Sequence, residues 1–334
     1  MSSAKQNIKN PLLLLLTAAI WGVAFVAQSV GAEYIGAFTF NCIRFLLGGM
    51  VLFPLIVLLE KREYAHMADH TKRFQPVTKI ELKGGILCGI FIFAASNIQQ
   101  IGIKYTSVGR AGFITALYVV LVPILGLFLK KKVAPLIWVC VSLALVGLYL
   151  LCMGNETGGP GFGDGLMIIS AVIFAFHILA IDYFSPRGRG TVISCIQFLV
   201  GGGASLIVAL IVEHPQLAGI RDAGVSLLYA GILSCGVAYT LQIVAQKGVN
   251  PAVASLILCL ESVISVLAGW VILGETLSPR ELAGCGLMFL AIVIAQVSPA
   301  IKRSPVRKKR AALSGNEKTV TDFGKDPGAS ATKA

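Results

Sequence analysis

Apolar runs as long as a membrane is thick recur along this chain, and they leave it few possible folds. Pro11–Val30 and Ala111–Leu129, for example, contain no Asp, Glu or Lys. A helix of about 20 apolar residues crosses the hydrocarbon core of a bilayer. Because lipid offers the backbone no hydrogen-bond partner, only helices and closed barrels cross it, and runs of this length are typical of helices.

Ten such runs follow one another, so we expect an all-α integral membrane protein with ten transmembrane helices. The composition agrees, because only 13% of the 334 residues are charged, whereas a soluble domain carries about 25%. The expected spans are Pro11–Val30, Ile35–Leu59, Gly84–Ile103, Ala111–Leu129, Val133–Met153, Gly165–Phe184, Thr191–Val212, Ala223–Gln246, Pro251–Leu273 and Leu282–Ser298.

The placement of Lys and Arg predicts how the chain is oriented. A net charge of +12 would suggest a nucleic-acid partner in a soluble protein. Here the basic residues gather in alternate loops, such as Lys130–Lys132, while the intervening loops hold only Lys104, Arg110, Arg221 and Arg280. Cytoplasmic loops carry the excess of Lys and Arg. We therefore expect a bacterial-type cytoplasmic (inner) membrane protein with both termini in the cytoplasm, and no nucleic-acid partner.

Both ends of the chain are expected to lie outside the membrane. Residues 1–10 form a cytoplasmic N-terminus, and the apolar run after them is too long for a signal peptide and lacks a clean cleavage site. Residues 299–334 are polar and basic, so we expect a disordered cytoplasmic tail. The KRSPVRKKR stretch of this tail predicts contact with anionic membrane lipid, with protein binding as the alternative.

Cysteine and phosphate-binding patterns narrow the chemistry. All eight Cys lie within expected spans and none forms a CxxC pair, so neither a disulfide framework nor a zinc site is supported. The P-loop pattern GxxxxGK[ST] is absent from the sequence. We expect no metal, no cofactor and no ATP hydrolysis by this chain.

The chain also contains an internal repeat. Asn41–Gly49 reads NCIRFLLGG and Ser194–Gly202 reads SCIQFLVGG, which are identical at six of nine positions and 153 residues apart. Further along, the offset is 143, and Gln99, Lys104 and Gly126 correspond to Gln242, Lys247 and Gly269. The loop that starts at Glu60 absorbs the difference.

The repeat predicts two units of five spans, residues 11–153 and 165–298. Because five is odd, the second unit must cross the membrane in the opposite sense to the first. Inverted repeats are typical of secondary transporters, in which the substrate site lies between the halves near the midplane of the bilayer.

Four groups of residues within the spans form a recognisable pattern. They are Trp21-Gly22, Arg44-Phe45, Tyr105-Thr106-Ser107 before Ala111–Ala116, and Leu260-Glu261-Ser262-Val263 before Leu273-Gly274-Glu275. This pattern resembles the EamA type of the drug/metabolite transporter superfamily over nearly all of residues 11–298, although Ser262 stands where family members usually have Pro. The resemblance implies a ten-helix carrier of two inverted halves with a central cavity, for substrates such as amino acids, metabolites, nucleotide sugars or drugs.

The predicted function is therefore a secondary transporter that exports a small metabolite, amino acid or drug by alternating access. The sequence leaves open whether a proton or ion gradient is coupled to this transport. The alternatives are an intramembrane lipid-modifying enzyme and a non-transporting membrane scaffold. An enzyme is disfavoured because the ionisable groups within the spans are scattered. The sequence leaves open whether the chain works as a homodimer.

Arg44 and Glu261 are the ionisable groups expected deepest in the membrane, where such groups are costly. Arg44 could bind a substrate carboxylate through its planar guanidinium, or it could be structural. Glu261, whose repeat partner is Tyr118, is the candidate for carrying a coupled proton. The alternative is a protonated Glu261 that only holds neighbouring helices together.

His177 and Asp182 are the other ionisable groups within the spans. His177 could relay protons, or it could pack inside the bundle with its hydrogen bonds satisfied. Asp182 lies near the expected cytoplasmic end of its span, where we expect it to be solvated, with Arg187 or Arg189 as candidate partners.

Neutral polar and aromatic residues recur at helical spacing and predict helix faces that line a cavity. The alternative is that these faces hold neighbouring helices together through hydrogen bonds and packing. Gly85 and Gly89 are expected to be packing positions instead. The substrate-cavity candidates are Trp21, Phe25, Gln28, Asn41, Arg44, Asn97, Gln100, Tyr118, His177, Gln197, Tyr239, Gln242 and Glu261.

Overall fold

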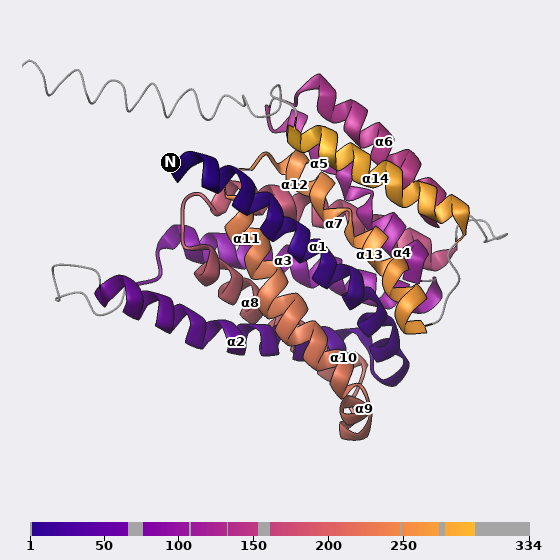
Figure 1. Cartoon of the computed structure of the whole chain (residues 1–334). Coiled ribbons are helices and arrows are strands. Elements are labelled where there is room, and N and C mark those ends of the chain that lie inside the picture. Colours follow the sequence, from indigo (N-terminus) through magenta and orange to yellow (C-terminus); the bar gives the residue numbers. More distant parts are fainter. Residues whose placement is uncertain are drawn as a thin grey trace, which may run out of the picture.

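A computed structural model describes residues 2–65, 76–106, 108–131, 133–152, 161–247, 249–273 and 278–297. Within these ranges the chain forms helices joined by short connections, and no strand occurs in them (Figure 1). The expected all-α class is therefore confirmed. The expected tail, residues 299–334, lies outside the described residues.

The helices follow the expected spans in order. The first half of the chain forms α1 (Ser2–Tyr34), α2 (Ala37–Ala65), α3 (Lys79–Gly102), the 3-10 turn η1 (Ile103–Tyr105), α4 (Val108–Ala116), α5 (Tyr118–Phe128) and α6 (Pro135–Cys152). The second half forms α7 (Phe162–Phe184), α8 (Gly190–Val212), α9 (Leu217–Asp222), α10 (Gly224–Leu228), the π-helix η2 (Tyr229–Tyr239), α11 (Thr240–Gln246), α12 (Pro251–Leu258), α13 (Glu261–Ala268), the π-helix η3 (Gly269–Leu273) and α14 (Pro279–Val297).

Eight stretches of the described residues are long and apolar enough to cross a membrane, so the chain is a multi-pass membrane protein. The expected fifth and tenth spans fall on shorter apolar helices, Pro135–Leu150 and Leu282–Ala295. These belong to α6 and α14, which pack side by side at one edge of the bundle (Figure 1). The eight longer stretches are Lys9–Tyr34, Ala37–Lys61, Lys79–Tyr105, Ala111–Phe128, Phe162–Phe184, Gly190–Val212, Gly224–Gln246 and Pro251–Ile272.

Side-chain polarity suits a lipid surround. Large apolar side chains such as Phe128 and Val271 are 81% and 73% exposed, whereas the charged side chains of Arg44 and Glu261 are buried. In a bilayer the outer surface must be apolar, and polar groups must find their partners inside the bundle.

Two expected spans each contain a tight turn, called a break below, at which the backbone stays in the right-handed helical region. Ala111–Leu129 is divided at Leu117 into α4 and α5, and Pro251–Leu273 is divided just before α13. The amides of Leu117 and Leu260 each donate to the carbonyl three residues earlier, at 3.2 Å. Such a bond tightens the turn, and a tight turn inside a longer helix often marks a functional position.

Close helix contacts depend on glycines, as expected for Gly85 and Gly89. These residues of α3 lie against Ile196 and Val200 of α8, and a Cβ at Gly85 would come within 2.4 Å of the Ile196 side chain. Small residues let helix backbones approach closely in lipid. A larger side chain at Gly85 would therefore push α3 away from α8.

Candidate functional site

Buried side chains from both halves of the chain enclose a cavity between the helices. The space between its atoms, part of which is open to solvent, amounts to about 480 Å³. Apolar and aromatic walls alternate with polar groups. The lining comprises Trp21, Ala24, Phe25 and Gln28 of α1, Arg44 of α2, Gln99 of α3, Thr115 of α4, Tyr118 of α5, Phe174, His177 and Ile178 of α7, Ser234 and Tyr239 of η2, Gln242 of α11 and Glu261 of α13.

Tyr118 and Glu261 meet in this cavity. Each is the first residue of the helix that follows a break, α5 and α13 respectively. The Tyr118 hydroxyl donates to Oε1 of Glu261 at 2.9 Å, and both side chains are buried. The breaks thus bring a phenol and a carboxyl from opposite halves of the chain into direct contact.

Arg44 brings a positive charge to the same cavity. The residue is 2% exposed, and its Nη1 donates to Oε1 of Gln28 at 3.0 Å. The guanidinium carbon lies 5.7 Å and 5.0 Å from the ring centroids of Phe40 and Phe45, positions that suit cation–π attraction. Its Nε finds no acceptor among the described residues. The guanidinium therefore keeps part of its donor capacity for a ligand.

His177 and two aromatic side chains form a further part of the cavity wall. Nε2 of His177 lies 3.1 Å from Oε1 of Gln197, and its ring meets the edge of Tyr239 with centroids 6.1 Å apart. The ring centroids of Trp21 and Tyr239 are 4.5 Å apart, and the two ring planes meet at 58°. A flat apolar group could stack in this region.

The structure brings nine of the thirteen sequence candidates to the cavity lining and places four elsewhere. Asn41 donates to Oδ1 of Asn97 at 2.9 Å, and Asn97 donates to the Ser205 hydroxyl at 3.0 Å, so these two residues join α2, α3 and α8. Gln100 donates to the backbone carbonyl of Gln28 at 2.9 Å. Gln197 does not line the cavity but hydrogen-bonds to His177, which does. The nine lining candidates are Trp21, Phe25, Gln28, Arg44, Tyr118, His177, Tyr239, Gln242 and Glu261.

Three polar lining residues were not among the candidates. Gln99 donates through Nε2 to the Thr115 hydroxyl at 3.1 Å, and the Ser234 carbonyl lies 3.4 Å from Nε1 of Trp21. A signal for Gln99 existed, because its repeat partner Gln242 was a candidate. Thr115 and Ser234 carry no comparable signal.

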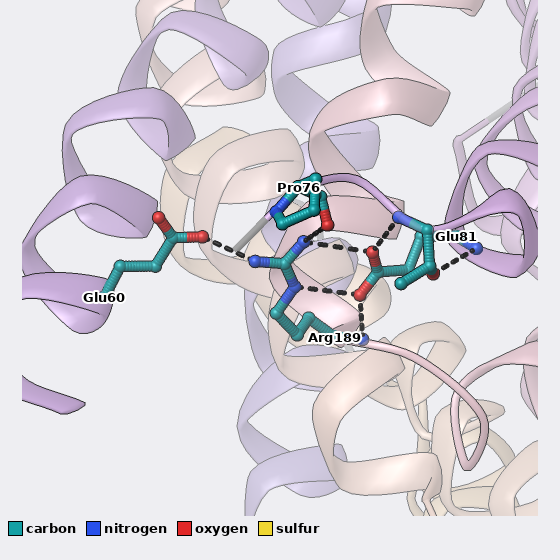
Figure 2. A network of polar contacts seen from close by, with 5 residues as sticks. Glu60, Pro76, Glu81 and Arg189 are labelled. Atoms are coloured by element: carbon teal, nitrogen blue, oxygen red, sulfur yellow. Dashed lines mark hydrogen bonds and ion pairs between the residues drawn. The ribbon is translucent and has the colours of Figure 1, made fainter. Parts of the chain in front are cut away.

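An ion-pair network outside the cavity lining joins several helix ends (Figure 2). Arg189, just before α8, donates through Nε and Nη2 to the two carboxylate oxygens of Glu81 at 2.8 Å and 3.0 Å. Its Nη1 reaches Oε1 of Glu60 on α2 at 2.5 Å, and Nη2 reaches the Pro76 carbonyl at 3.2 Å. Glu81 also caps α3 together with Thr78. One guanidinium thus ties α2 and α3 to the second half of the chain.

The expected partner of Asp182 was wrong. Asp182 on α7 forms its ion pair with Lys131, which follows α5. Arg189 is held by the two glutamates, and Arg187 stacks on Tyr183 with its guanidinium carbon 4.0 Å from the ring centroid. Sequence proximity favoured the arginines, but the fold brings a lysine of the other half closer.

A different carboxylate accepts hydrogen bonds from the N-terminal turn of α2. Glu213, at the end of α8, accepts from the backbone N–H groups of Phe38 and Thr39 at 2.9 Å and 2.7 Å, and from the Thr39 hydroxyl at 2.7 Å. These are free donors at the first turn of α2, where a negative charge is favourable. Both ends of the α2 and α8 pair are therefore held by a glutamate.

Comparison with known proteins shows where similar chains occur. The sequence model of the EamA-like transporter family matches residues 9–153 and again residues 161–296. An uncharacterized transporter of Archaeoglobus fulgidus is 28% identical over 84% of this chain and 83% of its own length. The uncharacterized inner membrane transporter YedA of Escherichia coli K12 is 25% identical over 82% of this chain and 86% of its own length.

The fold is also similar to that of a solved protein. A crystal structure with 18% sequence identity superposes with a TM-score of 0.70, covering 88% of this chain and 98% of the other. At that level of identity the likeness shows the fold alone.

Proposed function

The chain belongs to the EamA-like transporter family, and we propose that it is a secondary carrier that exports a small metabolite, amino acid or drug across the cytoplasmic membrane by alternating access. The observation that carries this proposal is the buried cavity, which both halves line and at which two spans are broken. A substrate site between the two halves is typical of secondary transporters.

We further propose that ten spans form two inverted repeats, residues 11–153 and 165–298. Residues on a two-fold axis contact their own equivalents. Phe45 and Phe198, which are 153 positions apart, stack with ring centroids 5.8 Å apart, and Tyr118 contacts Glu261 across an offset of 143. These self-equivalent contacts support an axis between the halves.

Two further features of the helices support the same symmetry. A Cβ at Gly49 would contact Leu199, and a Cβ at Gly202 would contact Leu46, which is the reciprocal pair at an offset of 153. The helix breaks at Leu117 and Leu260 are likewise equivalent, at an offset of 143. Chance similarity between apolar helices would not make contacts reciprocal.

The closures at the two ends of α2 are also equivalent, and we propose that they open alternately. Glu60 pairs with Arg189 at one end. At the other end Glu213 lies against Gly36, where a Cβ would fall 2.1 Å from its carboxyl carbon. At an offset of 153, Glu60 corresponds to Glu213 and Gly36 corresponds to Arg189. The repeat thus supplies one carboxylate latch for each side of the membrane.

Glu261 is the proposed carrier of a coupled proton. It is 4% exposed and accepts a hydrogen bond from Tyr118, and no ion pair joins it to a cation among the described residues. An ionised carboxylate in such a place is costly. We propose that Glu261 holds a proton when the loaded cavity is closed and releases it when the cavity opens to water.

Transport by purified protein in liposomes tests the proposal for a substrate of any kind. The liposomes are loaded with a cell extract of small metabolites, and the compounds that leave are identified by mass spectrometry with and without a pH gradient. We expect a few compounds to leave much faster than from protein-free liposomes, and the gradient to change their rate.

Glu261→Gln should remove the effect of the gradient while leaving exchange of bound substrate. Glu33→Gln, which changes an exposed carboxyl near the end of α1, is the matched control and should behave as the unaltered protein. Release no faster than from protein-free liposomes for every compound would contradict the carrier and favour an enzyme or a scaffold.

A further inference from the structure

The cavity holds two opposite charges that are not paired with each other. Arg44 bonds to the neutral Gln28, and Glu261 bonds to the neutral Tyr118. No ion pair between Arg44 and Glu261 occurs in the part of the chain that the structure describes. Both residues line the same cavity, together with Tyr239. The two charges can therefore balance across the cavity while each remains available to a ligand or a proton.

The other groups around the cavity do not alter this balance near neutral pH. The helices α1, α3, α4 and α11 contribute only neutral side chains to the lining. Phenols and thiols are uncharged near pH 7, and an ordinary imidazole is mostly so. The titratable neighbours are Tyr118 of α5, His177 of α7, Cys235 and Tyr239 of η2, and Cys259 beside Glu261.

A net charge in a closed cavity within a membrane is strongly disfavoured. The empty cavity is neutral when Arg44 is positive and Glu261 is negative. If an anion then binds to Arg44, the cavity can close at zero net charge only when Glu261 takes up a proton. The reverse also holds, since a protonated Glu261 leaves the Arg44 charge without a counter-charge.

We propose, on the basis of the carrier function above, that the substrate is an organic monoanion that binds Arg44 while one proton binds Glu261. The carboxyl gains the proton from water as the anion enters, and it returns the proton to water as the anion leaves. One anion and one proton then cross together without net movement of charge. The carrier exports wherever the product of anion and proton concentrations is higher inside the cell.

The lining also suggests the form of the anion. Nε of Arg44 lacks an acceptor among the described residues, and a guanidinium matches the two oxygens of a carboxylate. Trp21, Phe25 and Tyr239 offer faces and edges for a flat apolar body. An aromatic ring with one ionised carboxyl group therefore fits the chemistry of this cavity.

Proton counting during binding tests the inference. Purified protein in a weakly buffered detergent solution is titrated with 3-phenylpropionate, 3-phenylpropionamide and phenethylamine, which share a ring and differ in charge. We expect the anion to bind best and to take up about one proton per molecule bound. Its affinity should rise as the pH falls.

Variants assign the two roles. Glu261→Gln should keep anion binding and abolish proton uptake, whereas loss of uptake in His177→Gln alone would assign the proton to His177. Arg44→Gln should weaken anion binding roughly tenfold or more. Arg44→Lys keeps the positive charge but lacks the two-pronged guanidinium, so its anion affinity should lie between those of the unaltered protein and Arg44→Gln. Anion binding by this variant would also show that the substituted protein folds.

Several results would overturn the inference. The protein could bind 3-phenylpropionamide or phenethylamine more tightly than 3-phenylpropionate, bind the anion without taking up a proton, or bind none of the three compounds. In liposomes the flux of the anion should respond to a pH gradient and not to a membrane potential set with valinomycin and potassium. If only neutral or cationic compounds of the metabolite extract leave the liposomes, the proposed carrier function is supported and the inference of an anionic substrate is contradicted. If no compound leaves the liposomes, both the carrier function and the anion inference are contradicted.

Discussion

Tyr118 and Glu261 are the residues through which the two halves of the chain touch inside the cavity. Their 2.9 Å hydrogen bond lies among buried side chains, where a lost partner is not replaced by water. A hydrogen bond to a charged group contributes about 1.5 to 3 kcal/mol, and one between neutral groups about 1 kcal/mol. The contact should therefore be measurable as a coupling energy.

We expect Tyr118→Phe and Glu261→Met each to lower stability by about 1–2 kcal/mol, because each leaves a buried polar group without its partner. Since the residues touch, the double variant should lose less than the sum, with a coupling of about 1 kcal/mol. Unfolding of the four proteins in mixed detergent micelles measures this cycle. Strict additivity would place the two side chains apart.

For single residues, the sequence predicted which side chains are buried better than it predicted whether a buried side chain faces the cavity or another helix. The depth of Arg44 and Glu261 followed from the length of their spans, and both line the cavity. Asn41 and Asn97 were also predicted to line it, but they hydrogen-bond to each other between helices. A polar helical face looks the same in a sequence whether a cavity or another helix lies opposite it.

Helix ends and breaks govern how the elements can move relative to one another. The Glu60–Arg189–Glu81 network ties α2 and α3 to the start of α8 at one end (Figure 2). The contact of Glu213 with the start of α2 ties the other end. Alternating access requires that one of these ties be broken while the other holds.

We expect Arg189→Gln to open the end of the bundle that the network closes, because it leaves two carboxylates facing each other without their shared cation. A single cysteine in place of Ser234, in a chain without native cysteines, should then react several-fold faster with a water-soluble maleimide. Arg187→Gln is the matched control, since the guanidinium of Arg187 contacts Tyr183 on its own side of the bundle. Equal reactivity in both variants would show that the network does not act as a latch.

The breaks could not be read from local sequence. Leu117 and Leu260 are ordinary apolar residues, and Ser262 replaces the proline that the family resemblance implies. The structure nevertheless starts α13 at Glu261, and the Ser262 hydroxyl donates to the Gly112 carbonyl of α4 at 2.8 Å. Contact between the two broken spans, which no single segment encodes, accompanies both breaks.

For the whole molecule, some contacts in the structure join residues that the offsets 153 and 143 relate, while the inverted repeat, the number of spans and their orientation remain proposals. The apolar exterior and polar interior follow from composition and periodicity. The choice of Lys131 as the partner of Asp182 did not follow, because it depends on how the halves pack together.

The proposed orientation predicts which loops face which side. Single cysteines at Glu33 and Ser278 should react with a membrane-impermeant reagent added outside intact cells, because these positions lie in the proposed outer loops. Cysteines at Lys61 and Lys131 should react only after the membrane is opened. Labelling of Lys131 and Ser278 from the same side would contradict the inverted repeat.

The central claim is that the two halves rock about the shared cavity and open one end at a time. Pulsed electron resonance measures it most directly, with one spin-label pair at the exposed Lys61 and Arg187 and another at the exposed Glu33 and Leu217. The account predicts that across pH and in the Arg189→Gln variant, any population with a longer distance at one end has a shorter distance at the other. Distances that lengthen at both ends together, or that never change at either end, would contradict it.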